Sequence, residues 1–154
     1  QEIQRLIGRS LRQAVDLEAL DGLTIQIDCD VLQADGGTRC AAITGGWVAL
    51  AIAINKLVSE NRVPSTALRR QIAAVSAGVV EGVPLLDLDY AEDSTSEVDM
   101  NFVMTDEDTF VEIQGTAEGK PFAKSTFDAL ASLAQKGTRE LMLAQKKALQ
   151  TRGE

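Results

Sequence analysis

The chain has 154 residues and a formal net charge of −8, with 45% hydrophobic and 25% charged residues, as in an ordinary globular protein. It contains no histidine, which excludes Ser-His-Asp and Cys-His catalysis, and two cysteines are too few for structural zinc. No signal peptide or apolar run of roughly 20 residues is evident, so we expect a cytoplasmic protein without a membrane partner.

The charges are distributed unevenly along the chain. Residues 71–119 contain twelve of the 23 carboxylates and neither Lys nor Arg, which leaves 11 acids against 15 bases elsewhere. An acidic block between two basic ones can place a metal ion beside a polyanion. The negative net charge therefore does not exclude nucleic acid as a partner.

The first predicted element is an amphipathic helix over residues 1–16. Its apolar residues recur at the spacing of one helix face, and Arg5, Arg9 and Arg12 form a stripe on the opposite face. Such a stripe is most often a solvated surface. A guanidinium group also binds phosphate, or the carboxylate of a partner, with two parallel hydrogen bonds.

A buried strand is predicted next, over residues 23–32, with Asp28 and Asp30 on its polar face. It leads through a glycine-rich turn with Gly37, Thr38 and Arg39 into a buried helix over residues 38–58. Free N–H groups and a cation at a helix N-terminus suit a phosphate. An ordinary strand-to-helix connection with Thr38 as N-cap is the alternative, and the turn alone favours it.

The second half of the chain predicts two hairpins, within residues 72–89 and 97–116, and a long helix from about residue 125. This order of elements predicts an α/β (α+β) fold in which a mixed sheet packs under helices. Asp93 precedes a strand and Asp99 lies on its polar face, so the two carboxylates can converge. Two oxygen ligands suit Mg²⁺ or Mn²⁺, and an acidic turn facing water is an equally good interpretation.

Four segments in order, EIQRLIGRSLR, IDCDVLQADGGTRCAAITGG, DLDYAEDSTSEVDMNFV and VEIQGTAEGKPF, strongly resemble RNase PH, a phosphate-dependent 3′→5′ exoribonuclease also called tRNA nucleotidyltransferase. The resemblance covers essentially the whole chain, which looks like a bacterial member of the family from which the N-terminal part has been lost. It implies the ribosomal protein S5 domain 2-like, RNase PH-like fold. We expect one such domain over residues 1–154, N-terminally incomplete because the chain starts at Gln1 inside a helical pattern.

The resemblance also implies a reaction and a site. Members remove 3′-terminal nucleotides from tRNA precursors and other RNA, including rRNA, with inorganic phosphate and Mg²⁺ or Mn²⁺, and release nucleoside diphosphates. The phosphate-binding positions correspond to Gly37, Thr38 and Arg39. The catalytic and metal-binding acids correspond to Asp93 and Asp99, with Asp93 the expected proton donor.

The family assembles as a homohexameric ring, a trimer of dimers. This gives Arg5, Arg9 and Arg12 two expected uses, at a subunit interface or on RNA. Family members carry a phosphate-binding arginine and a basic, tRNA-gripping region ahead of the segment that begins at Gln1. Without them we expect weaker binding of phosphate and tRNA.

Two other functions fit the same fold. One is a non-catalytic, RNA-binding ring subunit of an exosome-like assembly, and the other is one half of a polynucleotide phosphorylase. Retention of the Gly37–Arg39 turn together with Asp93 and Asp99 favours the enzyme over the ring subunit. The end of the sequence, in a helix without an appended RNA-binding module, argues against the polynucleotide phosphorylase.

Overall fold

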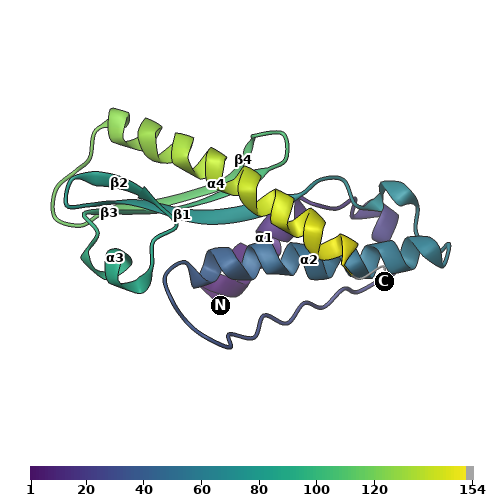
Figure 1. Ribbon diagram of the computed structural model, residues 1–154. Coiled ribbons are helices and arrows are strands. Elements are labelled where there is room, and N and C mark those ends of the chain that lie inside the picture. Colours follow the sequence, from purple (N-terminus) through teal and green to yellow (C-terminus); the bar gives the residue numbers. More distant parts are fainter. Residues whose placement is uncertain (152–154) are drawn as a thin grey trace.

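The computed structural model describes residues 1–151. Its helices are α1 (Glu2–Arg12), α2 (Thr38–Ser59), α3 (Tyr90–Thr95) and α4 (Lys124–Gln150), with short 3₁₀ turns η1 (Glu18–Leu20) and η2 (Ser65–Ala67). Its strands are β1 (Ile72–Val80), β2 (Val83–Leu86), β3 (Val98–Thr105) and β4 (Phe110–Ala117) (Figure 1). Both predicted hairpins and both long helices are confirmed.

The four strands form one sheet in the order β2-β1-β3-β4. Every pairing is antiparallel, so the α+β class is confirmed and the expectation of a mixed sheet is wrong. Short hairpin turns join the strands within each pair, which requires antiparallel neighbours. In the register of β1 and β3, Ser76 lies opposite Asn101 and Gly78 lies opposite Asp99.

Two hydrophobic clusters hold the layers together. In one, α1 and α2 pack on each other and on the start of β1, around Ile43, Trp47 and Ile54. In the other, α4 lies across the sheet and covers Phe102 and Met104 of β3 (Figure 1). Because α2 and α4 both contact β1, almost all of that strand is buried.

Helix α2 is long and apolar enough, by length and composition alone, to cross a membrane, which the sequence analysis did not anticipate. A single helix of this kind is weak support for a membrane protein, because the core helix of a soluble protein passes the same test. The side chains of Trp47, Leu50 and Ile54 are buried in the cluster shared with α1. Within the fold, α2 therefore has the role of a core helix.

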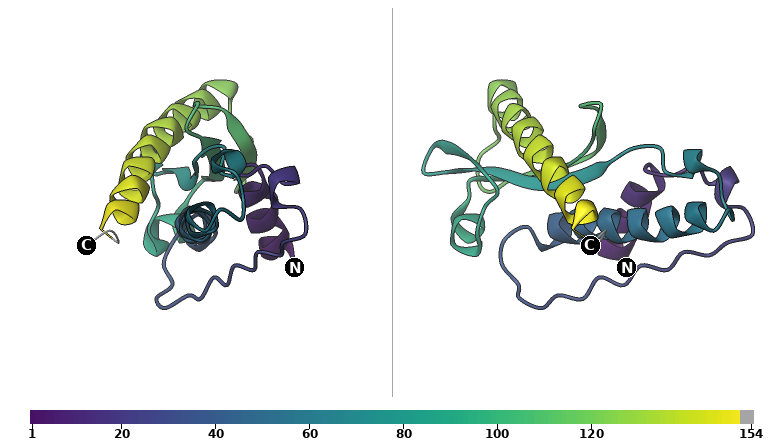
Figure 2. Two further views of the ribbon diagram at one scale, coloured as in Figure 1. Left: turned by 90° about the vertical axis from the view of Figure 1, so that its right-hand side faces the viewer. Right: turned by 45° about the vertical axis from the view of Figure 1, so that its right-hand side comes forward.

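The predicted strand over residues 23–32 is wrong. The chain is extended there and runs back along α2, but no other strand lies beside it within residues 1–151 (Figures 1 and 2). The alternation predicted which side chains turn inward, since Leu23, Ile25 and Ile27 are half-buried. Alternation fixes the faces of a segment, whereas a strand also requires a hydrogen-bonded neighbour.

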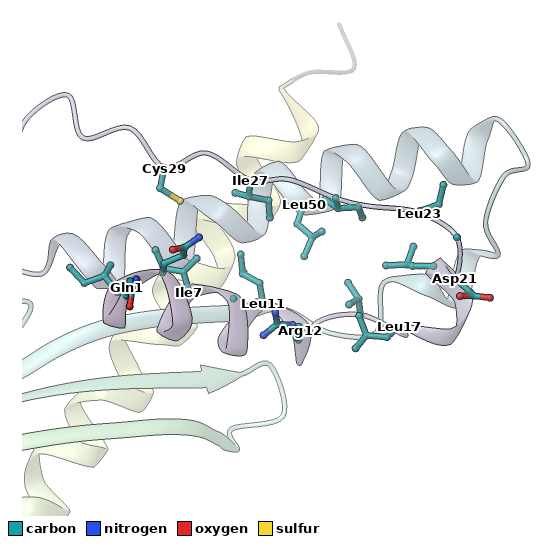
Figure 3. A pocket seen from close by; sticks show the side chains of 17 residues that line it. Gln1, Ile7, Leu11, Arg12, Leu17, Asp21, Leu23, Ile27, Cys29 and Leu50 are labelled. Atoms are coloured by element: carbon teal, nitrogen blue, oxygen red, sulfur yellow. The ribbon is translucent and has the colours of Figure 1, made fainter.

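A groove of about 810 Å³ separates this extended segment from α1 (Figure 3). Ile7 and Leu11 of α1 face Leu23 and Ile27 across it, and Leu50 of α2 lies at its floor. Its lining is mostly apolar and includes no carboxylate of the acidic block. The groove is therefore distinct from the polar site described below.

The extended segment gives a direct prediction for amide hydrogen exchange. Between residues 24 and 34, no backbone N–H donates a hydrogen bond to another described residue. We therefore expect these amides to exchange at nearly unprotected rates, while the amides of β1, inside the sheet, exchange slowly. Exchange measured by mass spectrometry checks this, and strong protection of residues 24–34 would contradict it.

Candidate active site

The turn before α2 presents N–H groups that no side chain caps. Gly37 is the N-cap residue, in the left-handed conformation with φ +72°, and it has no side chain to accept a hydrogen bond. Thr38 is the first helical residue and not the N-cap, and its hydroxyl donates to the carbonyl oxygen of Asp35 at 2.9 Å. The first turn of α2 therefore keeps free donors, which favour an anion.

Asp35 fastens this turn to α3. Its Oδ1 accepts hydrogen bonds from the N–H groups of Gly36, at 2.8 Å, and Tyr90, at 2.6 Å. These two backbone donors hold the pKa of Asp35 below its ordinary value. The carboxylate therefore connects the start of α2 with the start of α3, across 55 residues of chain.

The turn also packs closely on the connection between β2 and α3. A Cβ atom on Gly36 would lie 2.1 Å from the carbonyl oxygen of Leu88, so only glycine fits there. On Gly37 it would lie 3.4 Å from Oγ of Ser76. That hydroxyl in turn accepts the N–H of Leu88, at 3.1 Å.

This close packing predicts the effect of Gly36→Ala. Its methyl group would overlap the Leu88 carbonyl, so the turn must move away from α3 at a cost of about 1–3 kcal/mol. We expect a lower free energy of unfolding in chemical denaturation. We also expect a higher KM for inorganic phosphate, because the displaced turn should bind phosphate less tightly. The matched control is Gly45→Ala in α2, where nothing lies within 4 Å, and alanine should stabilise the helix by about 1 kcal/mol. Equal stability of Gly36→Ala and the unmodified protein would contradict this account.

Helix α3 carries one of the two predicted acids. It starts with a capping box, in which Asp89 accepts the N–H of Glu92 at 2.8 Å and Glu92 accepts the N–H of Asp89 at 3.0 Å. Both carboxylates are thereby used to begin the helix. Asp93, one residue further on, is half-buried and makes no such capping bond.

The structure brings Asp93 and Asp99 together. Asp99 is half-buried on β3, and burial is the largest of the effects that raise the pKa of its carboxyl group. The negative charge of Asp93, a hydrogen bond with Asp93 and the charge of Glu118 raise this pKa further. Two carboxylates in hydrogen-bonding contact in a partly buried place repel each other, which favours a proton or a cation between them.

Arg39 belongs to the same site. Its positive charge acts on Asp99 in the opposite direction and lowers the pKa of that carboxyl. The neighbouring residue, Cys40, fixes the start of α2 over β3, because its thiol donates to Oδ1 of Asn101 at 3.3 Å. Burial, with the charges of Asp87 and Asp99, raises the pKa of Cys40 to about 12, so it is an inert thiol.

The donor set fits a hard divalent cation. Within residues 1–151 there is no group of three or more His, Cys, Asp or Glu side chains that could enclose a metal ion. Mg²⁺ and Mn²⁺ do not need one, because one or two carboxylates suffice when water and phosphate oxygens complete the shell. Asp93 and Asp99 are the two residues that could hold such an ion.

The three arginines of α1 have different surroundings in the structure. Arg9 makes a bidentate ion pair with Glu112 of β4, with N–O distances of 2.9 Å and 2.6 Å, and this contact raises the pKa of Arg9. Arg12 folds back over Gly8 and lines the apolar groove (Figure 3). Arg5 is exposed and has no ion-pair partner in the described part of the chain. The sequence could not show that Glu112 engages Arg9.

Sequence reasoning missed Ser76 and Tyr90. Ser76 is buried in the central strand, and its hydroxyl orders the connection to α3. Nothing in an apolar strand sequence distinguishes such a serine from a small core residue. Tyr90 had a usable signal, because it is an aromatic residue within a stretch of carboxylates.

Two family models match the chain. Residues 1–54 match the 3′ exoribonuclease family, domain 1, and residues 70–137 match domain 2 of the same family. The chain belongs to the 3′ exoribonuclease (RNase PH) family. The first match includes the glycine-rich turn with Arg39, and the second includes Asp93 and Asp99.

Solved structures share the fold of this chain. A crystal structure of rice (Oryza sativa) Rrp46 is 18% identical, with a TM-score of 0.71 over 97% of this chain and 65% of that one. An archaeal exosome core is 22% identical, with a TM-score of 0.67 over 94% and 62%. The Archaeoglobus fulgidus exosome with RNA bound to the active site is 21% identical, with a TM-score of 0.65 over 93% and 60%. The chain thus spans less than two thirds of the length of each.

Proposed function

We propose that this protein is a phosphorolytic 3′→5′ exoribonuclease, which removes 3′-terminal nucleotides from RNA with inorganic phosphate. The observation that carries the proposal is the meeting of Asp93 and Asp99 at a place where the positive charge of Arg39 acts on Asp99, beside a helix start with free N–H groups. Membership of the 3′ exoribonuclease family supports the reaction class. A structure of similar fold, the Archaeoglobus fulgidus exosome, has RNA bound to its active site.

In the proposed reaction, an oxygen of inorganic phosphate attacks the phosphorus of the last phosphodiester bond. The bond from that phosphorus to the 3′ oxygen breaks, and the terminal nucleotide leaves as a nucleoside diphosphate. Gly37, Thr38 and Arg39 hold the attacking phosphate through backbone N–H groups and a guanidinium group, and the Thr38 hydroxyl joins them by turning its proton away from the Asp35 carbonyl oxygen. Catalysis of this kind depends mainly on positioning and on charge neutralisation, so it does not require a histidine.

The two acids have complementary roles in this proposal. Asp93 donates a proton to the departing 3′ oxygen, and the proton lost by the attacking phosphate balances this transfer. Asp99, together with the oxygen of Asp93 that carries no proton, would hold Mg²⁺ or Mn²⁺, and the bound ion would neutralise charge on the phosphate oxygens. Asp99 is fixed by the sheet, so it sets the position to which α3 brings Asp93.

We further propose that the substrates are the 3′ ends of tRNA precursors and other RNA, such as rRNA, in the cytoplasm. We propose a homohexameric ring, a trimer of dimers, as the assembly. Two of the similar structures are an exosome and an exosome core, which supports assembly into a larger particle. The exposed Arg5 has no ion-pair partner among the described residues, so it is available for RNA or for a neighbouring subunit.

The decisive experiment is incubation of the protein with a 3′-extended tRNA, with and without inorganic phosphate, followed by identification of the released nucleotide. Nucleoside diphosphates that appear only with phosphate are the expected result. Nucleoside monophosphates would mean hydrolysis and would overturn the proposal. RNA binding without any product would instead identify the alternative, a non-catalytic ring subunit of an exosome-like assembly.

A further inference from the structure

Tyr90 is a large aromatic residue that the core does not use. It is the only tyrosine of the chain and the first residue of α3, and 71% of it is exposed. Its hydroxyl makes no hydrogen bond to another residue in the part of the chain that the structure describes. Packing within this fold therefore does not explain why an aromatic side chain stands at this position.

The backbone under Tyr90 is held rigidly. Its N–H donates to Asp35 at 2.6 Å, which ties it to the glycine-rich turn. The capping box of Asp89 and Glu92 orders the first turn of α3 around it. Leu88, two residues earlier, is buried at 1% exposure and anchors the chain to the sheet. The ring therefore stands on a fixed support beside the proposed phosphate-binding turn.

Tyr90 and Asp93 are three residues apart on α3, so their side chains lie on the same face of the helix. Because Asp93 interacts with Asp99, Tyr90 stands about one helical turn from the acid pair. The other strongly exposed aromatic residue, Phe110, pairs with Met104 at the far end of β3, about 17 Å from Asp99 at ordinary strand spacing. Tyr90 alone of these two belongs to the candidate active site.

The charge around the acid pair favours contact with bases over contact with the RNA backbone. The surrounding carboxylates repel phosphodiesters that no cation neutralises, whereas a base is uncharged and has an aromatic face. Aromatic side chains stack on bases of any sequence, which suits an enzyme that removes successive nucleotides. An exposed ring on a rigid support loses little conformational entropy when it stacks.

We propose that Tyr90 is a base-stacking residue, whose ring packs on a base near the 3′ end of single-stranded RNA held at Asp93 and Asp99. The proposal rests on the proposed function, because it takes RNA as the ligand of this site. It adds a contact that recognises the base, beside the groups proposed to act on phosphate.

The test is the affinity for a fluorescently labelled oligoadenylate, measured by anisotropy for the unmodified protein, Tyr90→Leu and Tyr90→Phe. We expect Tyr90→Leu to raise the dissociation constant about 5- to 150-fold and Tyr90→Phe to keep the affinity. The matched control is Phe110→Leu, which removes an exposed aromatic ring away from the site and should leave the affinity unchanged. The loss in Tyr90→Leu should be the same at low and high salt, because stacking releases no counterions.

Two results would overturn the proposal: unchanged affinity in Tyr90→Leu, or an equal loss in Tyr90→Phe, which would assign the effect to the hydroxyl. Melting temperatures of both variants test for a folding defect. We expect none, because 71% of Tyr90 is exposed.

The proposed phosphorolysis is tested separately from base stacking. Tyr90-dependent RNA binding without nucleoside diphosphate release would uphold stacking and contradict the proposed reaction. Nucleoside diphosphate release with unchanged kcat/KM for RNA in Tyr90→Leu would uphold the proposed reaction and contradict stacking.

Discussion

Asp93→Asn should lower the turnover number for phosphorolysis about 10²- to 10⁴-fold, the range associated with loss of a general acid. Asparagine has nearly the same shape as aspartate, but its amide cannot donate this proton to the departing 3′ oxygen. The change also removes the negative charge that raises the pKa of Asp99, so the fold has no reason to lose stability. Nucleoside diphosphate release at saturating phosphate and RNA measures the effect.

The matched control for this variant is Asp106→Asn. Asp106 is an exposed carboxylate of the same acidic block, in the turn between β3 and β4, at the opposite end of β3 from Asp99. We expect its turnover to equal that of the unmodified protein, and both variants to elute at the same position in gel filtration. Near-normal turnover in Asp93→Asn would remove Asp93 from the catalytic machinery.

Arg39→Ala should raise the KM for inorganic phosphate about 10- to 150-fold, since a hydrogen bond to a charged group contributes about 1.5–3 kcal/mol. The KM for RNA should change much less, because the guanidinium group is proposed to face the attacking phosphate. Arg39→Lys keeps the charge but loses the planar fork, so an intermediate KM is expected. Initial rates over a phosphate titration at a fixed RNA concentration measure the KM for phosphate of the unmodified protein, Arg39→Ala and Arg39→Lys.

Arg12→Ala is the control for Arg39→Ala, because Arg12 is exposed and lines the apolar groove on the other side of α2. It removes the same charge from the molecule without touching the acid pair. A phosphate KM that rises equally in both variants would indicate a general effect of net charge. A phosphate dependence unchanged by Arg39→Ala would exclude Arg39 from the phosphate site.

The parts of the fold that the sequence predicted well are those decided by local patterns. Helix α2 begins at Thr38, as predicted, because a glycine-rich turn ends where a long apolar run begins. The β3–β4 hairpin was equally accessible, because a polar turn separates two alternating segments. Such signals depend on neighbours in sequence and need no knowledge of the rest of the molecule.

The parts that failed depend on partners far away in the sequence. Residues 23–32 carry the alternation of a strand, but pairing depends on a second chain segment that no local pattern reveals. The ion pair of Arg9 with Glu112, 103 residues later, was likewise not visible in the sequence. Long-range pairing of charges follows from the tertiary fold and cannot be read from helix periodicity.

In the candidate site too, some features were visible in the sequence and others depend on the tertiary fold. The residue types proposed for chemistry were visible as motifs, and the convergence of Asp93 on Asp99 was an expectation from their spacing. The supports of the site were not visible. Asp35 reaches the backbone of Tyr90, and Ser76 reaches that of Leu88, through contacts between segments that adjoin only after folding.

The extended segment over residues 24–34 has a consequence for how the molecule behaves at high concentration. Its free backbone groups and inward apolar side chains are the features by which one copy can template pairing with another. Asp28 and Asp30 are exposed on this segment, and edge-to-edge alignment of two copies would bring their like charges together. We therefore expect these two carboxylates to oppose aggregation through this extended segment, whose backbone groups are free to pair.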